Sequence, residues 1–340
     1  MKHIASIFIA LVLCISAAWA GDFEDGVAAH EKKDFATALR KFKSAAAQGD
    51  ADAQFNLGLM YSKGQGASQD YAEAMRWYKL AAEQGYVSAQ LNIGFMYSKG
   101  QGVVQDYAES LRWYKLAAAQ GDASAQLNIG IRYDNGQGVV KDYAEAMRWY
   151  KLAAAQGNDR AQFNLAVMYS EGQGVLQDYA ESLRWYKLAA AQGNGYAQSN
   201  LGLIYSKGRG VVQDYAEAMR WYKLAAAQGL SYSQFNLGLM YSKGQGVVQD
   251  YAEAARWYKL AAAQGDADAQ FNLGNMYVEG KGVVQNYIRA HMWYNLAAVA
   301  GDADSVKNRD FVAAKMTTQQ ISEAQKLARE CQARNFKNCD

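Results

Sequence analysis

The chain of 340 residues contains no proline, whereas it has 31 glycines, most of them at recurring places. Proline therefore cannot end the helices or shape the turns of this protein, and glycine is left to do both. This composition favours helices joined by turns that depend on glycine, and it predicts an all-helical protein.

Histidine is also scarce, and beyond residue 20 only His30 and His291 occur, near opposite ends of the chain. This distribution supports neither a nucleophile paired with a histidine nor a histidine metal site. The Ser-x-x-Lys motif of β-lactamases does not occur either. We therefore expect no enzymatic activity, no metal and no other cofactor.

Long apolar runs are lacking except for residues 4–18, which follow Lys2. This run is too short to remain across a bilayer, so no integral membrane span is expected. The small-residue pattern at Ala18 and Ala20 predicts that residues 1–20 are a signal peptide cleaved after Ala20, and that the protein is periplasmic or secreted. A lipid anchor on Cys14 is the second interpretation. It ranks lower because lipid attachment signals usually have a small residue before the cysteine, and this chain has Leu13 there.

Neither sign of charge predominates, since the formal net charge is +2 and cleavage after Ala20 would remove one lysine and no acid. A nearly neutral surface argues against nucleic acid and anionic membranes as partners.

Cleavage would leave only two cysteines, Cys331 and Cys339. An even number of cysteines in an exported chain predicts a disulfide, and two reduced thiols are the alternative. A continuous helix would hold these residues about 12 Å apart, so the bond requires the chain to turn back near Asn335.

The most abundant feature of the sequence is a unit of 36 residues that occurs seven times without insertion or deletion. Variants of Ala-Gln-Phe-Asn-Leu-Gly begin at Ala53, Ala89, Ala125, Ala161, Ala197, Ser233 and Ala269. A fixed period of this length indicates a solenoid, in which each unit buries its apolar side against its neighbours.

Each unit is predicted to hold two helices, which we call helix A and helix B. In the first full unit, apolar residues recur at helical spacing from Ala53 to Tyr61, and Gly64 ends this helix A. Asp70 then provides the N-cap of helix B, which Gly85 ends. One unit is therefore a helical hairpin.

The pattern shared by the units, Ala-x-x-Asn-Leu-Gly-x-x-Tyr-x-x-Gly-x-Gly-Val-x-x-Asp-Tyr-x-x-Ala-x-x-Trp-Tyr, resembles the Sel-one-like repeat, a relative of the tetratricopeptide repeat. The resemblance covers residues 50–301. It implies an α-solenoid, a right-handed superhelix of antiparallel helix pairs, and a role as an adaptor or scaffold.

The two ends depart from this pattern. Residues 21–49 lack the Gly-x-Gly loop and have Lys41 in place of the tryptophan, which predicts an N-terminal capping hairpin. In the seventh unit Ile288 and Met292 form an apolar pair that another element must cover. Thr317 can cap a final helix with an apolar stripe, so residues 302–340 are predicted to form a C-terminal capping helix and tail.

Candidate binding residues lie on helix A, because its entry varies between units that are otherwise nearly identical. In related superhelices this side of helix A lines the concave groove. An asparagine column and a few variable or apolar positions form the predicted partner-binding set, which is Asn56, Asn92, Asn128, Asn164, Asn200, Asn236, Asn272, Phe95, Arg160, Tyr196 and Tyr232.

Two interpretations of the asparagine column remain open. A carboxamide can donate and accept hydrogen bonds, which suits an extended peptide backbone. The same side chains could instead bond a neighbouring repeat's backbone or a helix end. For the variable positions, drift on a solvated surface is the alternative to recognition.

The sequence thus predicts an exported scaffold that binds a protein or an extended peptide, with envelope proteins as candidate partners. The alternative is a protein that binds cell-wall glycan, such as peptidoglycan, by stacking sugars on Tyr196 and Tyr232.

Overall fold

The computed structural model describes residues 21–299, 301, 303–337 and 339. All regular elements among these residues are helices, as the sequence predicts. The predicted signal segment 1–20, including Cys14, lies outside the described residues. The chain divides into two compact units, Met1–Ala161 and Gln162–Asp340, and each is described by itself.

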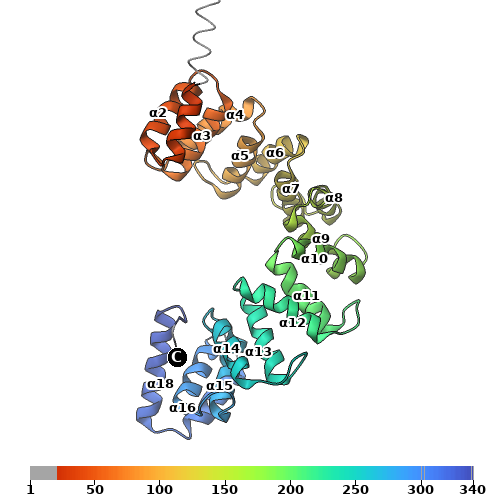
Figure 1. The fold of residues 1–340 in the computed structure, drawn as a ribbon, viewed down its shortest axis with the longest axis vertical. Helices are drawn as coiled ribbons and strands as arrows, with labels where there is room; N and C mark the ends of the chain where they lie inside the picture. The colour runs from red at the N-terminus through yellow and green to blue at the C-terminus, as the bar shows by residue number, and fades with distance from the viewer. Residues whose placement is uncertain (1–20, 300, 302, 338, 340) are drawn as a thin grey trace, which may run out of the picture. The chain divides into compact units, whose positions relative to one another are not determined.

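In the first unit, residues 21–31 are helical and precede α2. Antiparallel pairs then follow one another, and each helix packs against the next along the chain (Figure 1). The labelled helices are α2 (Phe35–Ala46), α3 (Ala51–Lys63), α4 (Tyr71–Glu83), α5 (Val87–Lys99), α6 (Tyr107–Ala119), α7 (Ala123–Asn135) and α8 (Tyr143–Ala155).

The second unit repeats this arrangement, and α9 (Asp159–Glu171) begins three residues before the boundary between the units. Helix A of each repeat has an odd label and helix B an even one. The helices that follow are α10 (Tyr179–Ala191), α11 (Gly195–Lys207), α12 (Tyr215–Ala227), α13 (Ser231–Lys243), α14 (Tyr251–Ala262), α15 (Ala267–Glu279), α16 (Tyr287–Ala298), α17 (Ala303–Ala313) and α18 (Thr318–Ala333).

The helices begin and end at the predicted capping residues. The Asp70 side chain accepts hydrogen bonds from the backbone amides of Ala72 and Glu73, at 2.9 and 3.0 Å, and so starts α4. Gly64 ends α3 in the left-handed conformation with φ of +68°. These bonds satisfy backbone groups that a helix end leaves unpaired. The predictions of Gly64 and Asp70 as boundary residues are confirmed.

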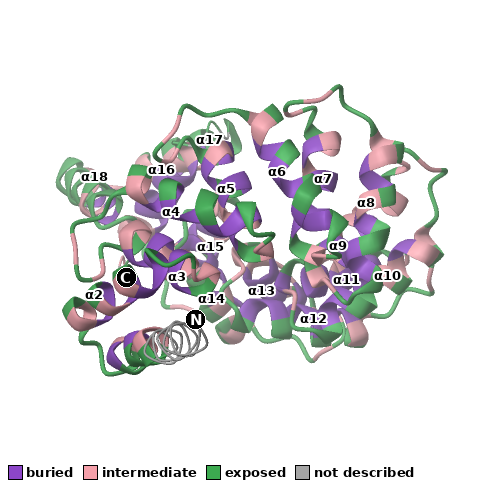
Figure 2. Ribbon diagram, turned by 90° about the horizontal axis from the view of Figure 1, so that it is seen from above, coloured by how far each residue is buried: buried purple, intermediate pink, exposed green. Residues whose placement is uncertain are grey.

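In six of the seven repeats, a tyrosine of helix B packs directly on a glycine of helix A, and the fourth repeat has Ala166 in place of this glycine. A Cβ atom added to Gly94 of α5 would lie 2.6 Å from the ring of Tyr114, which is 1 % exposed. The glycine therefore allows the ring to lie directly against the backbone. Figure 2 shows the resulting pattern, with buried residues along the packed sides of the helices and exposed residues in the loops.

Two glutamines of one repeat bond each other and the backbone at the end of the preceding hairpin, a feature that the sequence analysis did not anticipate. In the first full repeat, Gln84 Nε2 donates to Gln54 Oε1 and to the carbonyl oxygen of Gly49, both at 2.9 Å. Gln54 is buried, and its Nε2 donates to the carbonyl oxygen of Ala46 at 3.3 Å. The same pair recurs as Gln120–Gln90, Gln156–Gln126, Gln192–Gln162, Gln228–Gln198 and Gln264–Gln234.

The apolar pair of the seventh repeat is covered by two helices. Both α17 and α18 pack against α16, where Met292 is fully buried. The side chains and backbone amides of Thr317 and Gln320 form a reciprocal capping box at the start of α18. The sequence analysis foresaw this final helix but did not foresee α17, which occupies the place of helix A in a further repeat.

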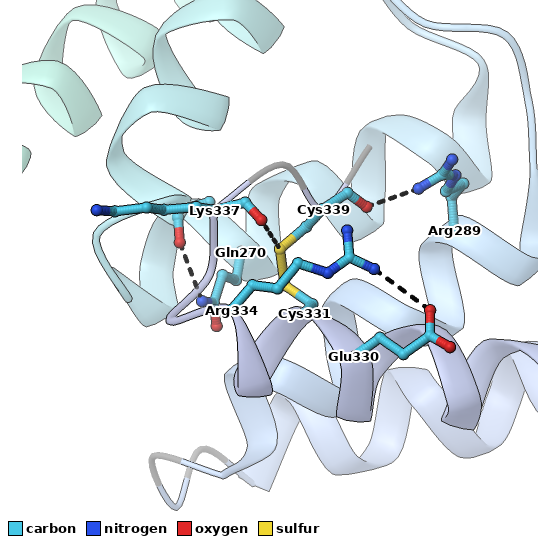
Figure 3. The surroundings of a disulfide bond; sticks show 8 residues. Gln270, Arg289, Glu330, Cys331, Arg334, Lys337 and Cys339 are labelled. Carbon is cyan, nitrogen blue, oxygen red and sulfur yellow. Dashed lines mark hydrogen bonds and ion pairs between the residues drawn. A yellow bond between two sulfur atoms is a disulfide. The ribbon is translucent and has the colours of Figure 1, made fainter.

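The tail after α18 turns back on itself (Figure 3). Cys331, buried in α18, forms a disulfide with Cys339. The turn uses positive φ angles of 51° at Asn335 and 62° at Phe336, at the place where the sequence required it. Arg289 of α16 donates to the carbonyl oxygen of Cys339 at 2.6 Å, which holds the tail against the last repeat.

His291 is predicted to make the stability of the C-terminal end depend on pH. The side chain is 3 % exposed, and its Nδ1 has no hydrogen-bond partner among the described residues. Burial and the nearby positive charge of Arg309 lower the pKa of His291 from its ordinary 6.5, against a smaller opposite effect of Asp310. The unfolded chain therefore takes up this proton at higher pH than the folded chain does.

We expect the free energy of unfolding to fall as the pH drops below about 6.5, by at most about 1.4 kcal/mol per pH unit from this group. The control is His291→Met, because the equivalent side chains of earlier repeats are Met75, Leu111, Met147, Leu183, Met219 and Ala255. Denaturant unfolding of both proteins between about pH 7 and pH 5 tests this. The same pH dependence in the two proteins would contradict the assignment to His291.

Candidate functional site

The asparagine column lies half-buried along the odd-numbered helices. Five of its seven members use the amide nitrogen within their own helix rather than for a neighbouring repeat. Asn56 Nδ2 donates to the backbone carbonyl oxygen of Asp52, four residues earlier, at 2.8 Å. The same bond is made by Asn128, Asn200, Asn236 and Asn272, at 2.7 to 2.9 Å.

This geometry changes what the column can offer. With one N–H engaged by the helix, each of these five carboxamides retains Oδ1 as an acceptor and its second N–H as a donor. The column can therefore still donate and accept, as the sequence suggested, although one donor of each of these five side chains is already used. Such groups suit the C=O and N–H groups of an extended backbone.

Two of the predicted residues, Asn92 and Phe95, lie together in the first unit at what we call the α3–α5 pocket, with a volume of about 290 Å³. Phe95 is 46 % exposed, and Lys99 Nζ lies 5.9 Å from the centre of its ring. The pocket is lined by Leu59, Ser62, Lys63, Tyr71, Tyr78, Asn92, Phe95, Met96 and Gln101.

Three other predicted residues, Tyr196, Asn200 and Tyr232, meet in the second unit at a larger pocket of about 570 Å³ between α11 and α13. We call it the α11–α13 pocket. Tyr196 and Tyr232 are 66 % and 46 % exposed, which is high for aromatic side chains. The lining is Tyr196, Ser199, Asn200, Leu203, Gln228, Gly229, Leu230, Ser231, Tyr232 and Gln264, none of which is charged.

Arg160 and the remaining asparagines are not brought into either pocket. Arg160 is exposed on α9. Asn56, Asn128, Asn164, Asn236 and Asn272 lie along the same helical face but line neither volume. The predicted set thus contributes to one pocket in each unit, and its other members lie outside both pockets.

Sequence analysis missed Ser199 and Leu230, which contribute to the α11–α13 pocket. Ser199 replaces an apolar residue, which in the other repeats is Phe55, Leu91, Leu127, Phe163, Phe235 or Phe271. Leu230 stands where most repeats have an aspartate or asparagine cap. A comparison of the first column would have singled out Ser199, whereas in the second column Tyr86 departs from the pattern as Leu230 does.

The described part of the chain shows no cluster of three or more His, Cys, Asp or Glu residues that could hold a metal ion. Within the same residues, none of the helices is both long and apolar enough for a membrane crossing.

Stacked antiparallel helix pairs with an exposed, pocketed helix-A surface define the class of the molecule as an α-solenoid. The chain belongs to the Sel1 repeat family, as the sequence resemblance implied. The family model matches seven consecutive stretches, residues 51–86, 87–122, 123–158, 159–194, 195–230, 231–266 and 267–302. Repeats of this family generally mediate protein–protein interactions as non-catalytic scaffolds.

Solved structures include several relatives. A Sel1 repeat protein from Oxalobacter formigenes is 38% identical, with a TM-score of 0.67 over 79% of this chain and 78% of that one. A protective antigen of uropathogenic Escherichia coli strains, which displays an SLR fold, is 29% identical, with a TM-score of 0.49 over 94% of this chain and 86% of that one.

An immunity protein from Pseudomonas aeruginosa is 22% identical and has a TM-score of 0.42 over 64% of this chain and 82% of that one. A search of curated proteins gave no significant match.

Proposed function

We propose that this protein is an adaptor that binds an extended segment of another protein along the helix-A surface of its repeats. The observation that carries the proposal is the convergence of Tyr196, Asn200 and Tyr232 at an uncharged pocket on that surface. Exposed tyrosines beside apolar side chains are typical of protein recognition sites. A binding role also agrees with the general role of Sel1 repeats.

The asparagine row supplies a reason for preferring an extended partner. Its members recur once per repeat, and five of them have the amide nitrogen engaged within the helix. The oxygens and second N–H groups that remain can bond successive parts of a peptide backbone, with little dependence on the partner's side chains. Side-chain pockets would then provide the specificity.

We further propose that the protein acts outside the cytoplasm, in the periplasm or after secretion. The predicted signal segment and the disulfide between Cys331 and Cys339 support this location, because disulfides persist in oxidising compartments. Envelope proteins are therefore the first partners to seek.

Affinity capture tests the adaptor role. The full chain, expressed with its own N-terminal segment, is compared with a variant in which Asn128, Asn164, Asn200, Tyr196 and Tyr232 are all alanine. We expect envelope proteins to be retained by the native chain and lost from the folded variant. Capture of the same set by both, or of nothing by either, would overturn the proposal.

The matched control replaces apolar side chains on a different surface. Val104, Val140, Val212 and Val248 are 86 to 88 % exposed in the loops between helices A and B. The first repeat has Ser68 at this position, so serine is compatible with the loop. Changing these four valines to serine should leave capture intact, and loss of capture would place the binding surface on the loops instead.

Glycan binding is the second candidate, and the exposure of Tyr196 and Tyr232 favours it. Soluble peptidoglycan fragments should then bind the native chain, and binding should survive loss of the asparagines but not of the tyrosines.

A further inference from the structure

The α11–α13 pocket exists where one repeat lacks a side chain that the others supply. In four repeats, helix A carries a phenylalanine at this position that lies against the helix-B tyrosine of the same repeat. The ring centres are 5.7 Å apart for Phe55 and Tyr78, and 5.9 Å apart for Phe235 and Tyr258. In α11 the equivalent residue is Ser199, which has no ring. The helix-B tyrosine of this repeat, Tyr222, meets the ring of Tyr232 instead, at a longer distance of 6.5 Å between ring centres.

The floor of the pocket is adapted to this change. Ser199 Oγ and Ser233 Oγ are hydrogen-bonded at 2.9 Å, and both side chains are buried. Ser233 itself replaces an alanine that every other repeat has. The bond gives each buried hydroxyl oxygen a partner, and Ser199 presents a polar group to the pocket that it lines.

The rim departs from the repeat pattern as well. Leu230 occupies the N-cap position of α13, which has no side-chain capping hydrogen bond. In α15 the equivalent Asp266 accepts a hydrogen bond from the backbone amide of Ala269 at 2.9 Å. Of the other helix-A starts, the one at Tyr86 before α5 also lacks such a bond. Loss of a cap is destabilising, and local rules that fail together in one place are expected at functional sites.

The chemistry of the lining limits the ligand. Leu203 and Leu230 provide apolar surface, and the rings of Tyr196 and Tyr232 add to it. No charged residue lines the pocket, so a charged side chain would lose its hydration without an ionic partner. Asn200 Nδ2 donates to the carbonyl oxygen of Tyr196 at 2.9 Å, which leaves its Oδ1 to accept an N–H.

We propose that the α11–α13 pocket binds a phenylalanine-like side chain of the partner segment, which takes the place of the ring missing at position 199. The backbone N–H beside this anchor side chain bonds Asn200 Oδ1. The inference rests on the proposed adaptor function and names its main specificity pocket.

The probe is N-acetyl-phenylalaninamide, titrated into the isotope-labelled full chain while the amide NMR signals of Tyr196, Leu230 and Tyr232 are followed. The test variant is S199F/S233A, which restores the residues that other repeats have at both positions. The control is Leu91→Phe, which places the same ring at the equivalent position of another repeat. N-acetylglucosamine is titrated in parallel to represent a glycan ligand.

We expect the phenylalanine probe to shift these signals in the native chain and in Leu91→Phe, and the shifts to be lost in S199F/S233A. Shifts that persist in S199F/S233A, or that are absent from the native chain, overturn the assignment. Shifts caused by the sugar alone also overturn it. If S199F/S233A does not fold, S199L/S233A replaces it, since leucine occurs at this position in two repeats.

The two proposals can fail separately. If affinity capture yields a partner but the probe does not bind, the adaptor role stands and the anchor pocket is wrong. If the probe binds at the pocket but no partner is captured, the pocket is a small-ligand site and the adaptor role is wrong.

Discussion

Gly246→Ala is expected to lower the free energy of unfolding by about 3 kcal/mol, although it adds a single methyl group. Gly246 lies in the loop between α13 and α14 and has φ of +70°. A Cβ atom there would lie 2.6 Å from the backbone carbon and oxygen of Tyr215, at the start of the preceding helix B. Backbone atoms cannot rotate away, so the two repeats must separate. Denaturant unfolding measures the effect.

Gly229→Ala is the matched control for this change. Gly229 also has a positive φ, of +87°, but a Cβ atom there would meet no atom within 4 Å. This substitution should therefore show only the conformational cost of alanine in the left-handed region, which is about 1 kcal/mol. The difference between the two variants reports the contact between repeats. Equal losses would show that this contact contributes nothing to stability.

Tyr258→Ala is expected to have the other large effect, a loss of about 3–5 kcal/mol. The side chain of Tyr258 is 1 % exposed and packs against Gly238 and Phe235. Removal of the ring leaves a cavity between α13 and α14 that the paired helices cannot close without moving. Since each repeat depends on its neighbours, we expect hydrogen exchange to increase first in these two helices.

Tyr258→Phe separates the ring from its hydroxyl group. Among the residues that the structure describes, this hydroxyl has one hydrogen-bond partner, Ser242 Oγ, at the long distance of 3.4 Å. Burial raises the pKa of Tyr258 to about 12, so the side chain is neutral throughout the ordinary pH range. We therefore expect Tyr258→Phe to cost less than about 1 kcal/mol. A loss as large as that of the alanine variant would show that the hydroxyl, not packing, stabilises the pair.

Helix boundaries were predictable from the sequence because local chemistry sets them. Asp70 caps α4 and Gly64 ends α3 through bonds and backbone angles that involve only neighbouring residues. The same argument applies to Thr317 at the start of α18. The seven-fold recurrence of these signals was enough to predict helical hairpins, and hence an α-solenoid.

The hydrogen-bond partners of the asparagine side chains could not be predicted from local sequence signals. A carboxamide at position 56 can bond its own helix, a neighbouring repeat or a ligand, and the sequence is compatible with all three. The structure selects the carbonyl four residues earlier, because helix geometry places it within reach. The helix α17 was missed for a related reason, since its apolar stripe is weak and its position depends on packing against α16.

The sequence by itself determined the repeat length, the alternation of helices A and B and the residues that begin and end them. These are local properties, and the 36-residue period repeats them seven times. Only the tertiary structure decided that Tyr196, Ser199, Leu230 and Tyr232 surround one pocket. The pocket depends on the distance between α11 and α13, and packing between repeats sets that distance. No local sequence signal specifies it.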